Sequence, residues 1–278
     1  MIRSFTVLIF PVILFAGSIE LSLHKSNIES SYIVEAPEQN LKSKLIFPIS
    51  LNTLDIGYCH DFGLLQLRVS SSFELSQTPS RGEDFDWYKD ELTLYSHSQS
   101  NLEKYADYTL EVLQEITQEL KILFAFNYKE LNMSWFNTQQ TDLNSGTVTN
   151  IEGKTLEYQQ TFYQYKLALN YEKELYKNIS LELQPALYFA YIDLKDKHLL
   201  RNFYTTQNAQ AYGYGLILKM AYRMNQSFKV ALSLSYESLS DNNTEMTFYN
   251  SLDEQYLILP ASYNYTKSRL GLECFYSF

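Results

Sequence analysis

The sequence predicts an all-β protein: a transmembrane antiparallel β-barrel of about ten strands with long extracellular loops. The chain holds 24 Tyr and 17 Phe among 278 residues, but only 9 Gly and 6 Pro. Apolar and polar residues alternate over many segments of roughly ten residues or more, as in strands that face lipid on one side and a lumen on the other. Beyond the first residues, no run is long and apolar enough for a membrane-spanning helix.

The first residues have the pattern of a secretory signal peptide. Arg3 precedes an apolar run from Phe5 to Phe15, and the small residues Ala16, Gly17 and Ser18 follow it. A basic residue, a short apolar core and small residues at the end are typical of such segments. We therefore expect a signal peptide over residues 1–18 and one barrel domain over residues 19–278. The alternative is that this run is a buried segment of the mature domain.

Alternation gives each expected strand an outer and an inner face. From Ile179 to Tyr191 the odd-numbered positions are mostly large and apolar, whereas the even-numbered positions are small or polar. If this strand continues without a bulge, Asp196 and His198 point into the lumen. The polar stretches 137–153 and 240–252 are expected to form long loops. The expected strands lie near residues 20–35, 41–61, 63–77, 87–96 or 103–118, 119–136, 156–174, 176–199, 207–224, 226–240 and 256–278.

The last residues give a further indication of a barrel. Leu270, Leu272, Cys274, Tyr276 and Phe278 share one face of an alternating strand. A final strand that ends on an aromatic residue resembles those of bacterial outer-membrane barrels, in which this end is an assembly signal. A secreted β-sandwich is the soluble alternative, because it would bury one face of each strand in the same alternating pattern.

The composition excludes several classes of function. The formal net charge is −10, which argues against nucleic acid as a partner and favours cationic ligands. Two cysteines, Cys59 and Cys274, are too few for a disulfide framework, although a single pairing stays open. The four histidines are scattered, without the Cys/His spacing of a zinc site. We therefore expect no metal and no cofactor.

Two short acidic motifs point to chemistry. The first is Asp84-Phe85-Asp86-Trp87, and the second is Asp196-Lys197-His198. Residues at i and i+2 of a strand lie on the same face, so each motif presents two ionisable side chains together. Three carboxylates and an imidazole around one cavity can activate a water molecule. The alternative for either motif alone is a solvated acidic loop.

With these motifs the chain resembles the omptins, a family of ten-stranded outer-membrane proteases whose active site lies at the outer rim of the barrel. The family has an Asp-x-Asp-Trp run on its second extracellular loop, matched by Asp84 to Trp87, and an Asp-x-His run on its fourth, matched by Asp196 to His198. The resemblance implies an aspartic-type endopeptidase in the outer membrane that cleaves peptides or proteins on the extracellular side. It also implies that His198 acts as general base, that Asp196 orients the imidazole, and that Asp84 and Asp86 bind the same water.

The same resemblance indicates substrate-binding residues. In the family, a Glu on the first strand and an Asp two residues before the catalytic Asp hold a basic side chain next to the cleaved bond. Glu29 matches the first position, whereas Leu194 replaces the second. Ser98 matches the end of a short family run between the two motifs. We therefore expect a cationic peptide or protein substrate, cleaved with relaxed or altered specificity.

The lipid-binding residues of the family are matched only in part. Tyr128 and Glu130 occupy two positions of the family's lipopolysaccharide site, but Asn132 and Thr161 stand where basic residues are expected. We therefore expect outer-membrane lipid as a partner, with little or no dependence on lipopolysaccharide. The rival interpretation is a non-catalytic barrel of the same fold that acts as an adhesin or surface-binding protein.

Overall fold

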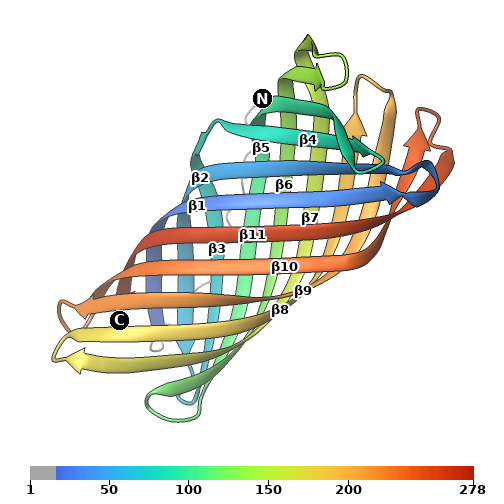
Figure 1. Ribbon diagram of the computed structural model, residues 1–278. Coiled ribbons are helices and arrows are strands. Elements are labelled where there is room, and N and C mark those ends of the chain that lie inside the picture. The colour runs from blue at the N-terminus through green and yellow to red at the C-terminus, as the bar shows by residue number, and fades with distance from the viewer. Residues whose placement is uncertain (1–16) are drawn as a thin grey trace.

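The computed structural model describes residues 17–278, which form antiparallel strands and one short 3-10 helix (Figure 1). Of the predicted signal peptide, residues 1–16 lie outside the described residues. Within residues 17–278, no helix is long and apolar enough to span a membrane. The elements are β1 (Gly17–Ala36), η1 (Pro37–Gln39), β2 (Leu41–Asp61), β3 (Leu65–Thr78), β4 (Ser80–Tyr88), β5 (Glu91–Glu115), β6 (Leu120–Asp142), β7 (Thr147–Tyr176), β8 (Ile179–His198), β9 (Phe203–Arg223), β10 (Phe228–Asn250) and β11 (Gln255–Ser277).

The sheet closes into a barrel because β1 pairs with both β2 and β11. β3 and β4 are two halves of one barrel strand, since both pair with β2 and with β5 and only Pro79 separates them. The eleven segments therefore occupy ten positions around the ring, as predicted, and the β-sandwich alternative is wrong. Gly17 and Phe278 hydrogen-bond to each other at one rim, which we call the terminal rim. The opposite rim, which carries the turn after β8, is called the far rim.

The outer face carries the apolar residues. A row of four tyrosines, Tyr108, Tyr128, Tyr163 and Tyr191, crosses β5, β6, β7 and β8 as direct cross-strand partners. Tyrosines gather at the interfaces between membrane and water, so this row marks one edge of the membrane-spanning band. β4 and the end of β8 lie beyond the row, toward the far rim. Six alternate residues of β9 within the band are 39–63% exposed: Tyr212, Tyr214, Leu216, Leu218, Met220 and Tyr222.

The far rim is built from strands rather than from loops, which corrects the prediction for residues 137–153 and 240–252. β6 continues to Asp142, β7 begins at Thr147, and β10 continues to Asn250. Beyond the tyrosine row the outer face of these strands meets water instead of lipid, so their sequences need no apolar alternation. On the inner face, β10 still buries Met246. β5 likewise runs unbroken through most of the two alternative segments 87–96 and 103–118, from Glu91 to Glu115.

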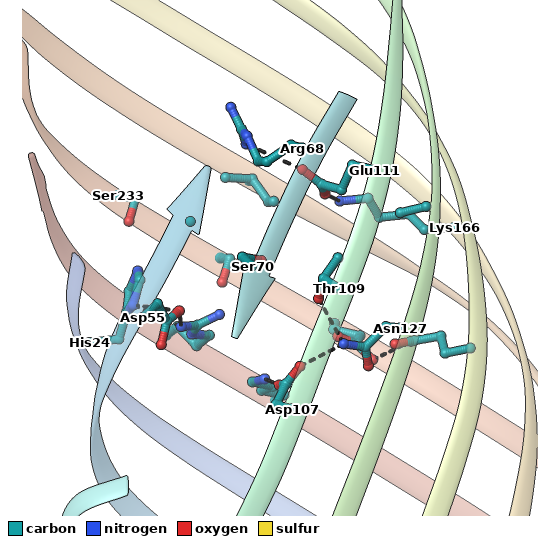
Figure 2. A pocket seen from close by; sticks show the side chains of 18 of the residues that line it. His24, Asp55, Arg68, Ser70, Asp107, Thr109, Glu111, Asn127, Lys166 and Ser233 are labelled. Atoms are coloured by element: carbon teal, nitrogen blue, oxygen red, sulfur yellow. Dashed lines mark hydrogen bonds and ion pairs between the residues drawn. The ribbon is translucent and has the colours of Figure 1, made fainter. Parts of the chain in front are cut away.

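The membrane-spanning part of the lumen is filled by ion pairs (Figure 2). Arg68 Nη1 lies 3.2 Å from Glu111 Oε2, and Lys166 Nζ lies 2.9 Å from Glu111 Oε1. Lys267 Nζ lies 3.3 Å from Asp107 Oδ2. Such pairing offsets the cost of removing charges from water. A cavity of about 200 Å³ remains among these side chains.

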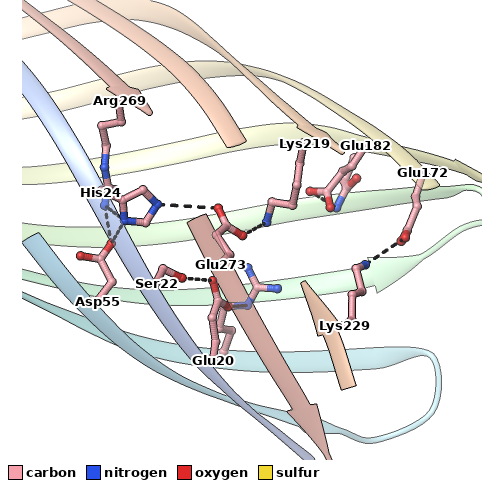
Figure 3. Close-up of polar contacts among 12 residues, drawn as sticks. Glu20, Ser22, His24, Asp55, Glu172, Glu182, Lys219, Lys229, Arg269 and Glu273 are labelled. Atoms are coloured by element: carbon pink, nitrogen blue, oxygen red, sulfur yellow. Dashed lines mark hydrogen bonds and ion pairs between the residues drawn. The ribbon is translucent and has the colours of Figure 1, made fainter. Parts of the chain in front are cut away.

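A second group of charges surrounds His24 (Figure 3). Its Nδ1 lies 3.1 Å from Asp55 Oδ2, and its Nε2 lies 3.7 Å from Glu273 Oε1. Arg269 donates to the same Asp55 oxygen, and Gly271 makes room for the imidazole, because a Cβ at that position would overlap it. These contacts join the neighbouring strands β1, β2 and β11 on the inner face of the barrel. Together the two groups argue against a wide pore.

An apolar layer closes the lumen between these charges and the far rim. Phe47 stacks on Tyr158 with 3.9 Å between ring centroids and lies 4.9 Å from the ring of Trp135. This layer forms the floor beneath the far rim. Its other large buried members include Ile28, Tyr32, Leu131, Met133, Phe162, Ile192, Tyr263 and Tyr265.

Candidate active site

β8 brings Asp196 and His198 to the inner side of the far rim. The Asp196 side chain is 2% exposed and the His198 side chain 16%, and His198 Nε2 lies 3.2 Å from Asp196 Oδ2. The pairing of β8 with β9 shows no register shift, so the inward orientation predicted from alternation is confirmed. The preceding inner positions are also buried: Gln184, Ala186, Ala190, Ile192 and Leu194.

Asp84 and Asp86 reach the inner side through two register shifts that cancel. Relative to β2, the strand formed by β3 and β4 contains one extra residue near Leu75 and a second one at Pro79. One extra residue would turn every following side chain to the other face, whereas two restore the original faces. The predicted inward orientation of the first motif is therefore also confirmed.

β4 lies directly against the apolar layer at Gly82. A Cβ at this position would overlap the indole ring of Trp135. Gly82 pairs with Ser98 on β5, and Asp84, two residues further along, pairs with Ser96. Glycine therefore lets the strand that carries Asp84 approach the apolar floor of the site.

Asp84, Asp86 and His198 line one cleft of about 320 Å³ at the far rim. β4 and β8 are separated in the ring by β5, β6 and β7, so the cleft spans the mouth of the barrel. The hydroxyl of Ser43 on β2 donates a hydrogen bond to Asp84 Oδ1 at 3.4 Å. Two motifs that are more than one hundred residues apart in the chain thus meet around one space, as their alternation predicts.

Asp196 lies behind His198 at the base of the site. Tyr32 Oη donates a hydrogen bond to Asp196 Oδ2, the oxygen that also faces the imidazole. Asp196 Oδ1 is buried and has no hydrogen-bond partner among the described residues. Apart from the imidazole, no basic side chain in residues 17–278 lies within ion-pair distance of this carboxylate. A buried carboxylate in this setting favours a positive charge on His198.

Burial and neighbouring charges set the protonation of both sides of the cleft. Burial alone would lower the pKa of His198, but the Asp196 carboxylate outweighs it, and the pKa is raised above its usual value. Burial raises the pKa of Asp84 to about 7, and the adjacent Asp86 carboxylate adds to this effect. Burial and Asp86 therefore both favour the protonated form of Asp84.

The three predicted substrate-binding residues do not line the cleft. Glu29 is exposed on the outer face of β1, because even-numbered residues occupy the inner face of this strand; the prediction that it enters the site is wrong. Ser98 is buried, and its hydroxyl hydrogen-bonds to that of Thr138 at 2.7 Å. Leu194 points inward but is buried in the apolar layer.

Three further residues at the site lie outside both motifs. Tyr32 comes from β1, Arg201 from the turn after β8, and Phe203 from the start of β9. Phe203 stacks on His198 with 4.4 Å between ring centroids and is its cross-strand partner. Alternation could have placed Tyr32 on the inner face, and the β8–β9 hairpin could have paired Phe203 with His198. Neither signal reveals that Tyr32 contacts Asp196, which lies on the opposite side of the ring.

The described part of the chain offers no metal site. Residues 17–278 contain no group of three or more His, Cys, Asp or Glu side chains arranged to hold a metal ion. Cys59 and Cys274 are both free.

Solved structures and a protein-family model resemble this chain. The outer membrane protease OmpT from Escherichia coli has a similar structure, with a TM-score of 0.80 at 11% sequence identity over 95% of this chain and 97% of OmpT. The outer membrane protein OprG from Pseudomonas aeruginosa gives a TM-score of 0.43 at 11% identity, over 95% of this chain and 96% of OprG. No curated protein sequence matches the chain. The Omptin family model matches residues 40–278, and the chain therefore belongs to the Omptin family.

Proposed function

We propose that the protein is an endopeptidase that cleaves peptides or proteins at the cell surface with an activated water molecule. Its family is one of outer-membrane proteases, and its fold is that of an outer-membrane barrel. The observation that carries the proposal is the arrangement of Asp84, Asp86 and His198 around one cleft, with Asp196 behind the imidazole.

In the proposed reaction, the water lies between Asp84 and His198 and attacks the carbonyl carbon of the peptide bond. His198 takes a proton from the water as general base, and Asp196 stabilises the imidazolium that forms. Asp84 accepts a hydrogen bond from the same water, and Asp86 beside it favours retention of one proton by the pair. The C–N bond then breaks, and His198 returns the proton to the leaving amine. No covalent intermediate forms.

The position of the cleft supports an extracellular site. The cleft lies at the rim opposite Gly17 and Phe278, where long strand extensions project beyond the tyrosine row. Outer-membrane barrels have short turns on the periplasmic side and longer projections outside. A substrate would therefore reach the cleft from the medium. The acidic balance of the chain favours substrates with a positive overall charge.

The outer face supports a membrane partner without a strong lipopolysaccharide requirement. Beside Tyr128 and Glu130, β5 supplies Lys104, whose Nζ lies 2.7 Å from Glu130 Oε2. This is a basic residue that the sequence prediction did not include. Glu130 balances its charge, and Asn132 donates a hydrogen bond to the same glutamate at 3.4 Å. The cluster therefore has no surplus positive charge for lipid phosphates.

Cleavage of a quenched fluorescent peptide library by the detergent-refolded protein tests the proposal. We expect cleavage by the wild type that does not occur with a His198→Ala protein of the same folded state. Absence of cleavage by the folded wild type, with and without lipopolysaccharide, would contradict the proposal and favour a surface-binding barrel.

A further inference from the structure

We propose that the cleft selects an apolar side chain at one of the two residues that flank the cleaved bond, and that a basic side chain is disfavoured there. This inference rests on the proposed endopeptidase function, and it specifies which peptide bonds are cleaved.

The wall of the cleft is apolar along one side. Val34 from β1, Leu45 from β2 and Met246 from β10 are at most 7% exposed and form its floor. Phe248 from β10 and Leu259 from β11 are half-buried and form its side. An apolar side chain that covers these residues would remove further apolar surface from water.

This apolar wall is continuous with the proposed catalytic base. The Phe248 ring lies 5.9 Å from that of Phe203, which in turn stacks on His198 at 4.4 Å. A peptide whose carbonyl group lies near His198 therefore places an adjacent side chain within reach of the wall. The wall is part of the cleft that contains Asp84 and Asp86, not a separate patch on the surface.

The cleft offers no additional carboxylate for a basic side chain. In the described chain, its only acidic lining residues are Asp84 and Asp86, and both belong to the proposed water-binding pair. Leu194, at the position that the family resemblance assigns to an acidic residue, is buried in the apolar layer beneath. A lysine or arginine side chain placed against the wall would lose water without gaining a carboxylate partner.

Two cations at the cleft act against a basic side chain. Lys42 and Arg201 both line it. Lys42 Nζ lies 3.2 Å from Glu35 Oε1, so its charge is partly balanced. Arg201 lies close enough to act electrostatically on both Asp84 and His198. A second positive charge in this space would be repelled.

The test uses quenched peptides with one common flanking sequence. The central pair is varied among Leu, Phe, Ala, Lys and Arg, and residues at the peptide ends are adjusted so that all peptides carry the same net charge. We expect kcat/KM to be about tenfold or more higher for Leu or Phe than for Ala, Lys or Arg. Mass spectrometry of the products identifies which side of the bond carries the selected residue.

Substitutions in the apolar wall test whether it causes the preference for apolar side chains. Phe248→Ala should reduce kcat/KM severalfold more for the Phe peptide than for the Ala peptide, mainly through KM. Leu259→Glu should raise the relative cleavage of the Lys peptide. Tyr249→Ala is the matched control, because Tyr249 is the next residue of the same strand but stacks on Tyr204 instead of lining the cleft. The control should keep the wild-type ranking.

The failures of the two proposals are distinguishable. Preferred cleavage at Lys or Arg by the wild type would overturn the apolar selection and leave the endopeptidase proposal intact. An equal loss for Phe and Ala peptides in Phe248→Ala would also overturn the selection. Failure of the folded wild type to cleave any peptide would overturn the endopeptidase proposal, and the inference with it.

Discussion

Tyr32 donates a hydrogen bond across the mouth of the barrel to Asp196 Oδ2, the same oxygen that lies 3.2 Å from His198 Nε2. Tyr32 belongs to β1 and Asp196 to β8, with β9, β10 and β11 between them in the ring. The phenol and the imidazole thus share one acceptor. Tyr32 is a positioning residue in the proposed site: it disperses the charge of Asp196 and fixes the carboxylate that orients the base.

Replacement of Tyr32 by Phe should shift the pH profile of cleavage. Without the phenol, Asp196 keeps more charge for His198, so the pKa of the imidazole should rise further. Since the proposed base must be neutral, the acidic limb of the kcat/KM profile should move to higher pH. Tyr158→Phe is the control, because the Tyr158 hydroxyl contacts Ser30 and not Asp196. An unchanged acidic limb in Tyr32→Phe would contradict the positioning role.

Replacement of Asp84 by Asn should change how stability depends on pH. The pKa of Asp84 is raised from 3.8 to about 7 in the folded protein. Its protonated form is therefore favoured by folding, and the associated stability is present at low pH and is lost as pH rises from about 4 to about 7. As pH rises across this range, the thermal midpoint of Asp84→Asn should increase relative to that of the wild type. A difference that does not vary with pH would contradict the raised pKa.

Replacement of Gly82 by Ala should destabilise the far rim. The new Cβ would overlap the Trp135 ring, and such overpacking costs about 1–3 kcal/mol. Gly57→Ala is the matched control, because a Cβ at this inner position of β2 has no neighbour closer than 3.4 Å. Thermal unfolding in detergent, monitored by the loss of cleavage activity, should show a lower midpoint only for Gly82→Ala. Equal midpoints for the two variants would contradict close packing of β4 on Trp135.

Lipopolysaccharide should have little effect on activity. The Lys104–Glu130 pair leaves the outer cluster without surplus positive charge, so lipid phosphates gain little by binding there. We expect kcat/KM in detergent to change less than about twofold when lipopolysaccharide is added. Activity that appears only after its addition would contradict this prediction.

The inward orientation of the Asp196–His198 motif follows directly from the sequence, whereas that of the Asp84–Asp86 motif is predicted correctly only because two irregularities cancel. On β8, alternation runs without a bulge from the membrane band to His198, so the faces follow from residue number alone. On β4, the faces are as predicted only because the extra residues near Leu75 and at Pro79 cancel. Neither extra residue has an unambiguous signal in the sequence, although Pro79 favours an irregularity.

Other features depend on the three-dimensional arrangement of the ring. The placement of Glu29 in the site rests on the resemblance alone, and a difference of one position on β1 puts its side chain on the outer face of the barrel. The contact of Tyr32 with Asp196 depends on the stagger between strands that are not neighbours, which no local pattern encodes. The sequence does not distinguish the extensions of β6, β7 and β10 from loops, because their outer face meets water and so lacks the apolar alternation of a lipid-facing strand.

The most direct test of the proposed mechanism compares four proteins on one cleaved peptide: wild type, Asp84→Ala, His198→Ala and Asp193→Ala. Asp193 lies on the same strand as His198 but is exposed on the outer face. We predict that kcat/KM falls at least about 100-fold for Asp84→Ala and His198→Ala and stays within about twofold of wild type for Asp193→Ala, with all four barrels folded. Wild-type cleavage that survives in folded Asp84→Ala or His198→Ala would contradict activation of water by this pair.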